Sequence, residues 1–165
     1  MRAHVEGLEA RGVPATAIDL PLRKAEAAVP VYRDRVAGLD EAASGAVLSG
    51  QSYGGRVASL LAAEDSAVYA GLVCFSYPLH RPGHADWDLR SSHWPEMGIP
   101  VLFLSGESDP FARIDLLRRA IDERLPDARL VTYPKIGHSL KNVLEDVLDQ
   151  TAAFVRGLEP TERLG

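Results

Sequence analysis

Short apolar runs alternate along the whole chain with stretches in which apolar residues recur at helical spacing. The apolar runs predict β-strands, and the helically spaced stretches predict α-helices. The predicted strands cover residues 15–20, 46–49, 69–76, 100–105 and 128–133, and the predicted helices cover residues 2–11, 24–39, 54–64, 111–124 and 143–157. Pro30 predicts a break or a start inside the second helix. Residues 78–98 show no clear period, and we expect a loop with at most one helical turn.

This alternation predicts an α/β protein. Nearly continuous apolar strands separated by helices are typical of a mostly parallel sheet, here of about five strands, with helices on both faces. Sites in such sheets form at the carboxyl ends of the strands.

Residues 46–64 combine a strand, a tight turn and a helix around Ser52. The segment Gly50-Gln51-Ser52-Tyr53-Gly54 has the G-x-S-x-G spacing of a nucleophile elbow. In such a turn the serine adopts a strained backbone conformation, and its hydroxyl projects from the end of the strand. Side chains two positions before and after it would collide, which explains Gly50 and Gly54. The alternative is a glycine-rich loop with an incidental serine, but the flanking strand and helix favour a nucleophile.

Two further polar residues follow predicted strands. Asp109 lies in the loop after the fourth strand, and His138 lies in the loop after the fifth. Taken alone, Asp109 could cap the helix that begins near Pro110, and His138 could be a surface histidine. Together with Ser52 they have the order Ser, Asp, His that is typical of an α/β-hydrolase triad. We therefore expect all three side chains at the same rim of the sheet.

Composition and charge indicate one soluble domain over residues 1–165. The 165 residues are 46% hydrophobic and 25% charged, which suffices for one core. The formal net charge is −5, and Lys and Arg form no stripe, so nucleic-acid binding is not expected. The chain starts without the apolar core of a signal peptide, and no apolar run approaches membrane-spanning length. We therefore expect a cytoplasmic protein that does not bind membranes.

Other reactive residue types are predicted to be structural. Cys74 lies within an apolar run, as expected for a small buried side chain. The loop at 78–98 holds metal-ligating residue types, but Pro82 and Gly83 interrupt helical spacing, so we expect no metal and no cofactor. The residues concerned are His80, His84, Asp86 and His93. Trp87 and Trp94 are expected to pack this loop, the alternative being that they wall an acyl pocket.

With these motifs in this order, the chain resembles the small uncapped α/β-hydrolases of the dienelactone-hydrolase-like group. More narrowly, it is similar to the branch with testis-expressed hydrolase-like proteins and a subunit of a histone-acetyltransferase complex. The motifs that carry the resemblance are residues 50–56, 71–83, 106–111 and 137–139, and it extends over about residues 3–157.

The resemblance implies a role for each site residue. Ser52 would be the nucleophile, His138 the general base and then acid, and Asp109 the residue that orients the imidazole. The backbone N–H of Tyr53 would donate to the oxyanion. His80 or Arg81, in a loop that borders the site in this family, would contact the substrate.

One expected part of the family fold has no counterpart in the sequence. A central strand and its glycine-rich loop, which supplies the second oxyanion donor, would precede the helix that begins near Arg2. We therefore expect either an N-terminally truncated chain or a genuinely impaired enzyme. The strands at 15–20 and 46–49 would then close up on each other or pair with another chain, for example in a homodimer through exposed strand edges.

The sequence thus favours a serine hydrolase that cleaves small carboxylic esters or related acyl compounds through an acyl-enzyme. Thioesters and peptides are alternative substrates, because one triad serves all of these reactions. A catalytically weak or inactive hydrolase-fold module for protein interaction is the alternative function.

Overall fold

The computed structural model describes residues 2–39, 45–85 and 89–158. Within these ranges, four parallel strands form one sheet in the order β1-β2-β3-β4. The strands are β1 (Val47–Gln51), β2 (Gly71–Phe75), β3 (Val101–Gly106) and β4 (Arg129–Tyr133). The helices are α1 (Arg2–Glu9), α2 (Ala25–Ala37), α3 (Tyr53–Glu64), α4 (Ile114–Arg124) and α5 (Leu144–Gly157), with short 3-10 turns at η2 (Trp94–Glu96) and η3 (Lys141–Val143).

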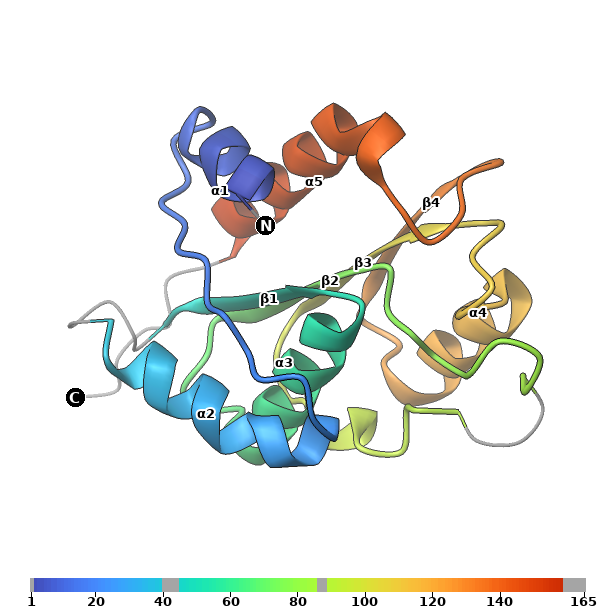
Figure 1. Ribbon diagram of the computed structural model, residues 1–165, viewed down its shortest axis with the longest axis horizontal. Coiled ribbons are helices and arrows are strands. Elements are labelled where there is room, and N and C mark those ends of the chain that lie inside the picture. The colour runs from blue at the N-terminus through green and yellow to red at the C-terminus, as the bar shows by residue number, and fades with distance from the viewer. Residues whose placement is uncertain (1, 40–44, 86–88, 159–165) are drawn as a thin grey trace.

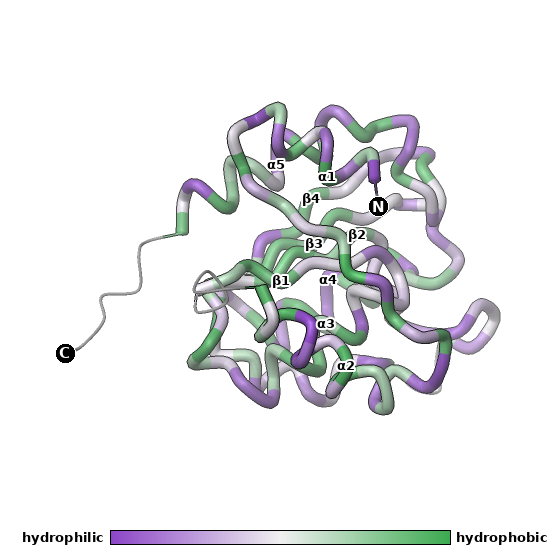
Figure 2. Tube along the Cα trace, turned by 60° about the vertical axis from the view of Figure 1, so that its left-hand side comes forward, coloured by the Kyte–Doolittle hydropathy of each residue, from purple (hydrophilic) through white to green (hydrophobic). Residues whose placement is uncertain are grey.

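The helices cover both faces of the sheet, which confirms the predicted α/β class. α1 and α5 lie on one face, and α2, α3 and α4 lie on the other (Figure 1). Alternate residues of β2 serve the two faces: Leu72 and Cys74 pack toward α2 and α3, whereas Val73 and Phe75 pack toward α5. The strands are accordingly hydrophobic at the centre of the molecule, and hydrophilic residues lie mostly outside (Figure 2).

The predicted strand at 15–20 is wrong. This segment belongs to a linker without regular structure that runs from α1, past β1, to α2 (Figure 1). An extended segment becomes a strand only where a neighbour pairs with its backbone. On the outer edge of β1, the Tyr32 hydroxyl instead donates to the Ser49 carbonyl at 2.9 Å and lies 3.4 Å from the Ser49 N–H. The predicted pairing of strand edges between two copies stays a prediction.

The predicted break at Pro30 is also wrong, because α2 continues through it. Pro30 lies on the exposed side of the helix, and the opposite side packs on α3 through Ala28, Val29 and Tyr32. A proline inside a helix removes one backbone hydrogen bond. Burial of this apolar side compensates for that loss.

Several side-chain predictions are confirmed. Cys74 is fully buried, and burial raises the pKa of its thiol. Trp94 is also fully buried and packs against Tyr77 and Phe103. Asp86 and Trp87 lie outside the described residues. Among the helices that the structure describes, none combines the length and apolarity needed to cross a membrane.

Candidate active site

Ser52 occupies the sharp turn between β1 and α3. Its backbone has φ 49° and ψ −115°, a region that costs a non-glycine residue roughly 1–3 kcal/mol. Backbone hydrogen bonds hold this conformation: the Ser52 N–H donates to the Phe75 carbonyl at 2.8 Å, and the Arg56 N–H donates to the Ser52 carbonyl at 3.1 Å. The turn therefore presents the serine hydroxyl at the carboxyl end of the sheet.

The glycines around Ser52 differ in the space that a side chain would have at each position. A Cβ added at Gly50 would lie 2.1 Å from the Gly54 carbonyl carbon, and one at Gly55 would lie 2.9 Å from the Gly50 carbonyl oxygen. A Cβ at Gly54 would meet nothing within 4 Å. The steric explanation therefore holds for Gly50 but is wrong for Gly54. The tight approach is between the end of β1 and the first turn of α3, where the backbones of Gly50, Gly54 and Gly55 meet.

His138 lies between the other two predicted residues. Its Nε2 is 2.8 Å from the Ser52 Oγ, and its Nδ1 is 2.8 Å from the Asp109 Oδ2. A carboxylate only accepts hydrogen bonds, so Nδ1 carries the proton and Nε2 is left to accept the serine hydroxyl. The Phe111 ring, with its centroid 4.5 Å from that of the imidazole, packs on the histidine and limits its movement.

Asp109 is buried, and both of its carboxylate oxygens are engaged. Oδ2 pairs with His138, while Oδ1 accepts the Phe111 N–H at 2.8 Å. Only 3% of the residue is exposed. α4 begins later, at Ile114, so Asp109 stabilises the turn before the helix instead of capping its first turn. The aspartate therefore has a structural role in addition to its contact with the imidazole.

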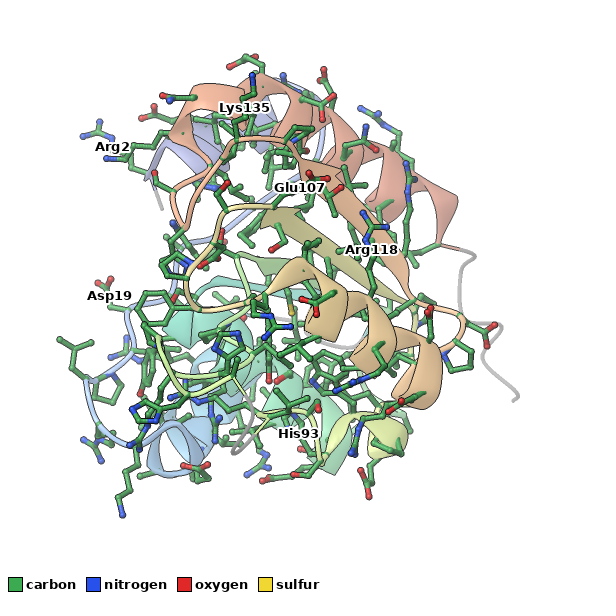
Figure 3. All side chains as sticks on the ribbon, turned by 90° about the vertical axis from the view of Figure 1, so that its right-hand side faces the viewer. Arg2, Asp19, His93, Glu107, Arg118 and Lys135 are labelled. Atoms are coloured by element: carbon green, nitrogen blue, oxygen red, sulfur yellow. The ribbon has the colours of Figure 1, made fainter. Side chains whose placement is uncertain are left out.

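The loops that carry Asp109 and His138 are packed backbone to backbone. The Ser108 N–H donates to the Ile136 carbonyl at 2.9 Å, and a Cβ added at Gly106 would lie 2.2 Å from the same oxygen. Figure 3 shows Glu107 and Lys135 on these two loops, above the sheet, whereas His93 lies below it. The backbone packing of the two loops fixes the separation of the aspartate and the histidine.

A cavity of about 430 Å³ opens beside Ser52. Its lining includes residues of α1, the linker at 15–20 and β1, together with Ser52, Tyr53 and His138. Tyr53 is the first residue of α3, so its N–H has no acceptor within the helix. That N–H is thus available to a ligand oxygen beside the serine.

His4 also lines this cavity, and sequence reasoning did not single it out. Its ring packs on Phe75 with the centroids 5.0 Å apart, and burial lowers its pKa, which favours the neutral imidazole. The available signal was its spacing of four residues from Leu8, which puts both on one side of α1.

The two predicted substrate contacts lie in different surroundings. His80 is only 2% exposed: its Nε2 accepts the Arg113 N–H at 2.9 Å, and its Nδ1 lies 2.9 Å from the Arg81 carbonyl oxygen. Nε2 therefore joins two loops, and Nδ1 holds a contact within its own loop, which favours a structural role. Arg81 is exposed and lines a separate cavity.

Comparison with known proteins gives one family. Residues 20–156 match the family described as "Alpha/beta hydrolase domain". Solved structures with a similar fold include an esterase of Pyrococcus furiosus, which is 13% identical, with 97% of this chain and 76% of that one covered at a TM-score of 0.80. A monoacylglycerol lipase of Paleococcus ferrophilus is 15% identical, with 96% of this chain and 90% of that one covered at a TM-score of 0.79.

A third similar structure is Est1E from Butyrivibrio proteoclasticus with ferulic acid bound. It is 17% identical, and 95% of this chain and 82% of that one are covered at a TM-score of 0.79. At these identities the likeness concerns the fold.

Proposed function

Because this chain belongs to the α/β-hydrolase domain family, we propose that it is a serine hydrolase of small carboxylic esters or related acyl compounds. The observation that carries the proposal is the chain of two hydrogen bonds, each 2.8 Å long, from Ser52 through His138 to Asp109. In this geometry a hydroxyl, an imidazole and a carboxylate act as nucleophile, base and orienting group.

The proposed reaction uses this chain of hydrogen bonds. Ser52 Oγ attacks the acyl carbon while its proton moves to His138 Nε2, and Asp109 stabilises the resulting imidazolium. The Tyr53 N–H donates to the oxyanion of the tetrahedral intermediate. His138 then protonates the leaving alcohol, which leaves an acyl-enzyme. A water molecule, deprotonated by His138, attacks this ester, and Ser52 recovers its proton from the imidazolium as the acid leaves.

The shape of the site supports small or extended acyl groups. The cavity beside Ser52 holds about 430 Å³, and the irregular linker at 15–20 forms part of its lining. Names of the similar structures point in the same direction, since they include an esterase, a monoacylglycerol lipase and a protein with bound ferulic acid. The closer resemblance to the dienelactone-hydrolase-like group stays part of this proposal.

The sequence identifies the Tyr53 N–H as an oxyanion donor, and loss of one such donor lowers kcat by roughly 10²- to 10³-fold in a studied protease. The alternative of a non-catalytic interaction module draws no support from the geometry, because such a module does not require the aligned serine, histidine and aspartate.

Labelling with a fluorophosphonate probe tests the proposal. The folded wild type should form one adduct, and Ser52→Ala should form none. Ser139→Ala is a matched control, because Ser139 is an exposed serine in the loop of His138, and it should label like the wild type. Absence of labelling in folded wild type, or equal labelling of Ser52→Ala, would refute the nucleophile. Release of p-nitrophenol from p-nitrophenyl acetate then measures turnover.

A further inference from the structure

A second cavity, of about 570 Å³, shares Tyr53 as a lining residue with the cavity beside the nucleophile. Its lining brings together residues that are far apart in the sequence: Arg23, Lys24, Glu26, Tyr53, Arg56 and Arg81. We propose that this cationic cavity is a subsite for an anionic group carried by the acyl substrate, a carboxylate or a phosphate. The inference rests on the proposed hydrolase function and adds a substrate class to it.

The fold holds the cationic residues beside the elbow. The Tyr53 hydroxyl donates to the Pro21 carbonyl at 2.9 Å, which fixes the turn that carries Arg23 and Lys24. Arg56 pairs with Glu26 at 2.8 Å and joins the first turns of α3 and α2. Both helices therefore begin at this cavity, and their N-termini add partial positive charge.

The charge of the cavity contrasts with that of the whole chain. The protein has a formal net charge of −5. The residues named above for this lining nevertheless include four cationic side chains and one carboxylate. That carboxylate is already neutralised, because Glu26 is paired with Arg56. Arg23, Lys24 and Arg81 are exposed, and within the described part of the chain none of them has a carboxylate at ion-pair distance. Ala25, His84 and Arg90 complete the lining. His84 and Arg90 have interactions of their own, so the subsite depends on the other three cations, Arg23, Lys24 and Arg81.

The position of Tyr53 links the two cavities. It follows Ser52 directly, supplies the proposed oxyanion donor and lines both spaces. An ester whose carbonyl lies at Ser52 can therefore place a charged end of its acyl chain against the cations of the neighbouring cavity. Arginine is suited to this task, since its planar guanidinium binds carboxylates and phosphates in a bidentate manner.

Two esters of matched shape test the proposal. Mono-p-nitrophenyl adipate and p-nitrophenyl hexanoate differ in a terminal carboxylate or methyl group. We expect kcat/KM to favour the adipate ester in wild type. The ratio of the two kcat/KM values should fall by roughly tenfold in Arg81→Gln and in the double variant Arg23→Gln/Lys24→Gln, and also in added salt. Arg35→Gln is the control, because Arg35 is an exposed arginine of α2 outside this lining, and both rates should stay unchanged.

Equal ratios in wild type and the cavity variants would overturn the subsite. If neither ester is hydrolysed, the proposed function fails, but the subsite can still be judged by calorimetric titration of adipate dianion into Ser52→Ala. Binding that weakens tenfold in Ser52→Ala/Arg81→Gln supports the subsite, and unchanged or absent binding refutes it. Inorganic phosphate in the same titration distinguishes a subsite for an anionic group of the substrate from a site for a free anion. If it binds while the anionic ester has no advantage, the cavity is a free-anion site and the substrate subsite is wrong.

Discussion

Replacement of Gly50 by alanine should disable the elbow, whereas the same replacement at Gly54 should not. The added methyl group at Gly50 would lie 2.1 Å from the Gly54 carbonyl carbon, 2.3 Å from the Gly55 nitrogen and 2.4 Å from the Gly54 oxygen. All three are backbone atoms, so no side chain can rotate out of the way. The strand and the helix must separate by at least about 1.3 Å to reach ordinary van der Waals contact, which begins at 3.4 Å.

The expected cost has two parts. Overpacking typically destabilises a protein by about 1–3 kcal/mol. Because the atoms in the way are backbone atoms, we expect the cost of Gly50→Ala at the upper end of this range. The same movement displaces Ser52 from His138, and a misplacement of about 1 Å lowers catalytic rates by roughly 10²-fold. The methyl group of Gly54→Ala would have no neighbour within 4 Å. Alanine is favoured over glycine in a helix, so we expect a gain of up to about 1 kcal/mol in the free energy of unfolding.

Urea denaturation and the rate of fluorophosphonate labelling measure these effects. Gly50→Ala should lose stability and label about 10²-fold more slowly, and Gly54→Ala should match or exceed wild type in both. If the two variants behave alike, or if Gly50→Ala is as stable and reactive as wild type, the close packing of β1 on α3 is not what the elbow requires.

Three further changes test other parts of the structure. Asp109→Asn keeps the acceptor for the Phe111 N–H but loses the carboxylate that orients the imidazole. Fluorophosphonate labelling should therefore slow by about 10³- to 10⁴-fold, with little change in the urea midpoint. Labelling as fast as in wild type would contradict the orienting role of Asp109. Burial, and then the charge of Arg56, lower the pKa of His93 to about 4 from about 6.5. The unfolded chain therefore takes up a proton that the folded chain does not, and stability should decline as pH falls from about 6.5 toward 4, with a flatter profile in His93→Gln. Tyr32→Phe removes the hydroxyl that bonds to the backbone of Ser49, and we expect a loss of about 1–3 kcal/mol in urea denaturation; an unchanged midpoint would show that water replaces it.

Much of the fold could be predicted because its signals are local. Each strand of the sheet is a short apolar run, and each helix has a repeating apolar side, so the order of elements and the parallel sheet follow from periodicity. The same holds for the elbow, because a strand, a tight turn and a helix are all encoded within residues 46–64. The order of Ser52, Asp109 and His138 then predicts that their loops share one rim.

Other features depended on partners that no local pattern reveals. The segment 15–20 has the composition of a strand, but its state depends on a neighbour along β1, and the Tyr32 hydroxyl bonds to the Ser49 backbone there. His80 lies in a loop rich in polar residues, yet its ring is buried because the Arg113 backbone packs on it. Burial is set by what lies across the fold, and so it could not be predicted from this loop.

By itself, the sequence determined the alternation of strands and helices, the strained turn at Ser52 and the residue types that can act as nucleophile, base and orienting acid, because these depend on neighbours a few positions away. Only the tertiary structure decided that the three side chains meet at 2.8 Å, that Gly50 and not Gly54 carries the steric requirement, and that scattered cations form one cavity. Distances and shared cavities arise from segments separated by tens of residues, and they exist only once the sheet and helices have packed.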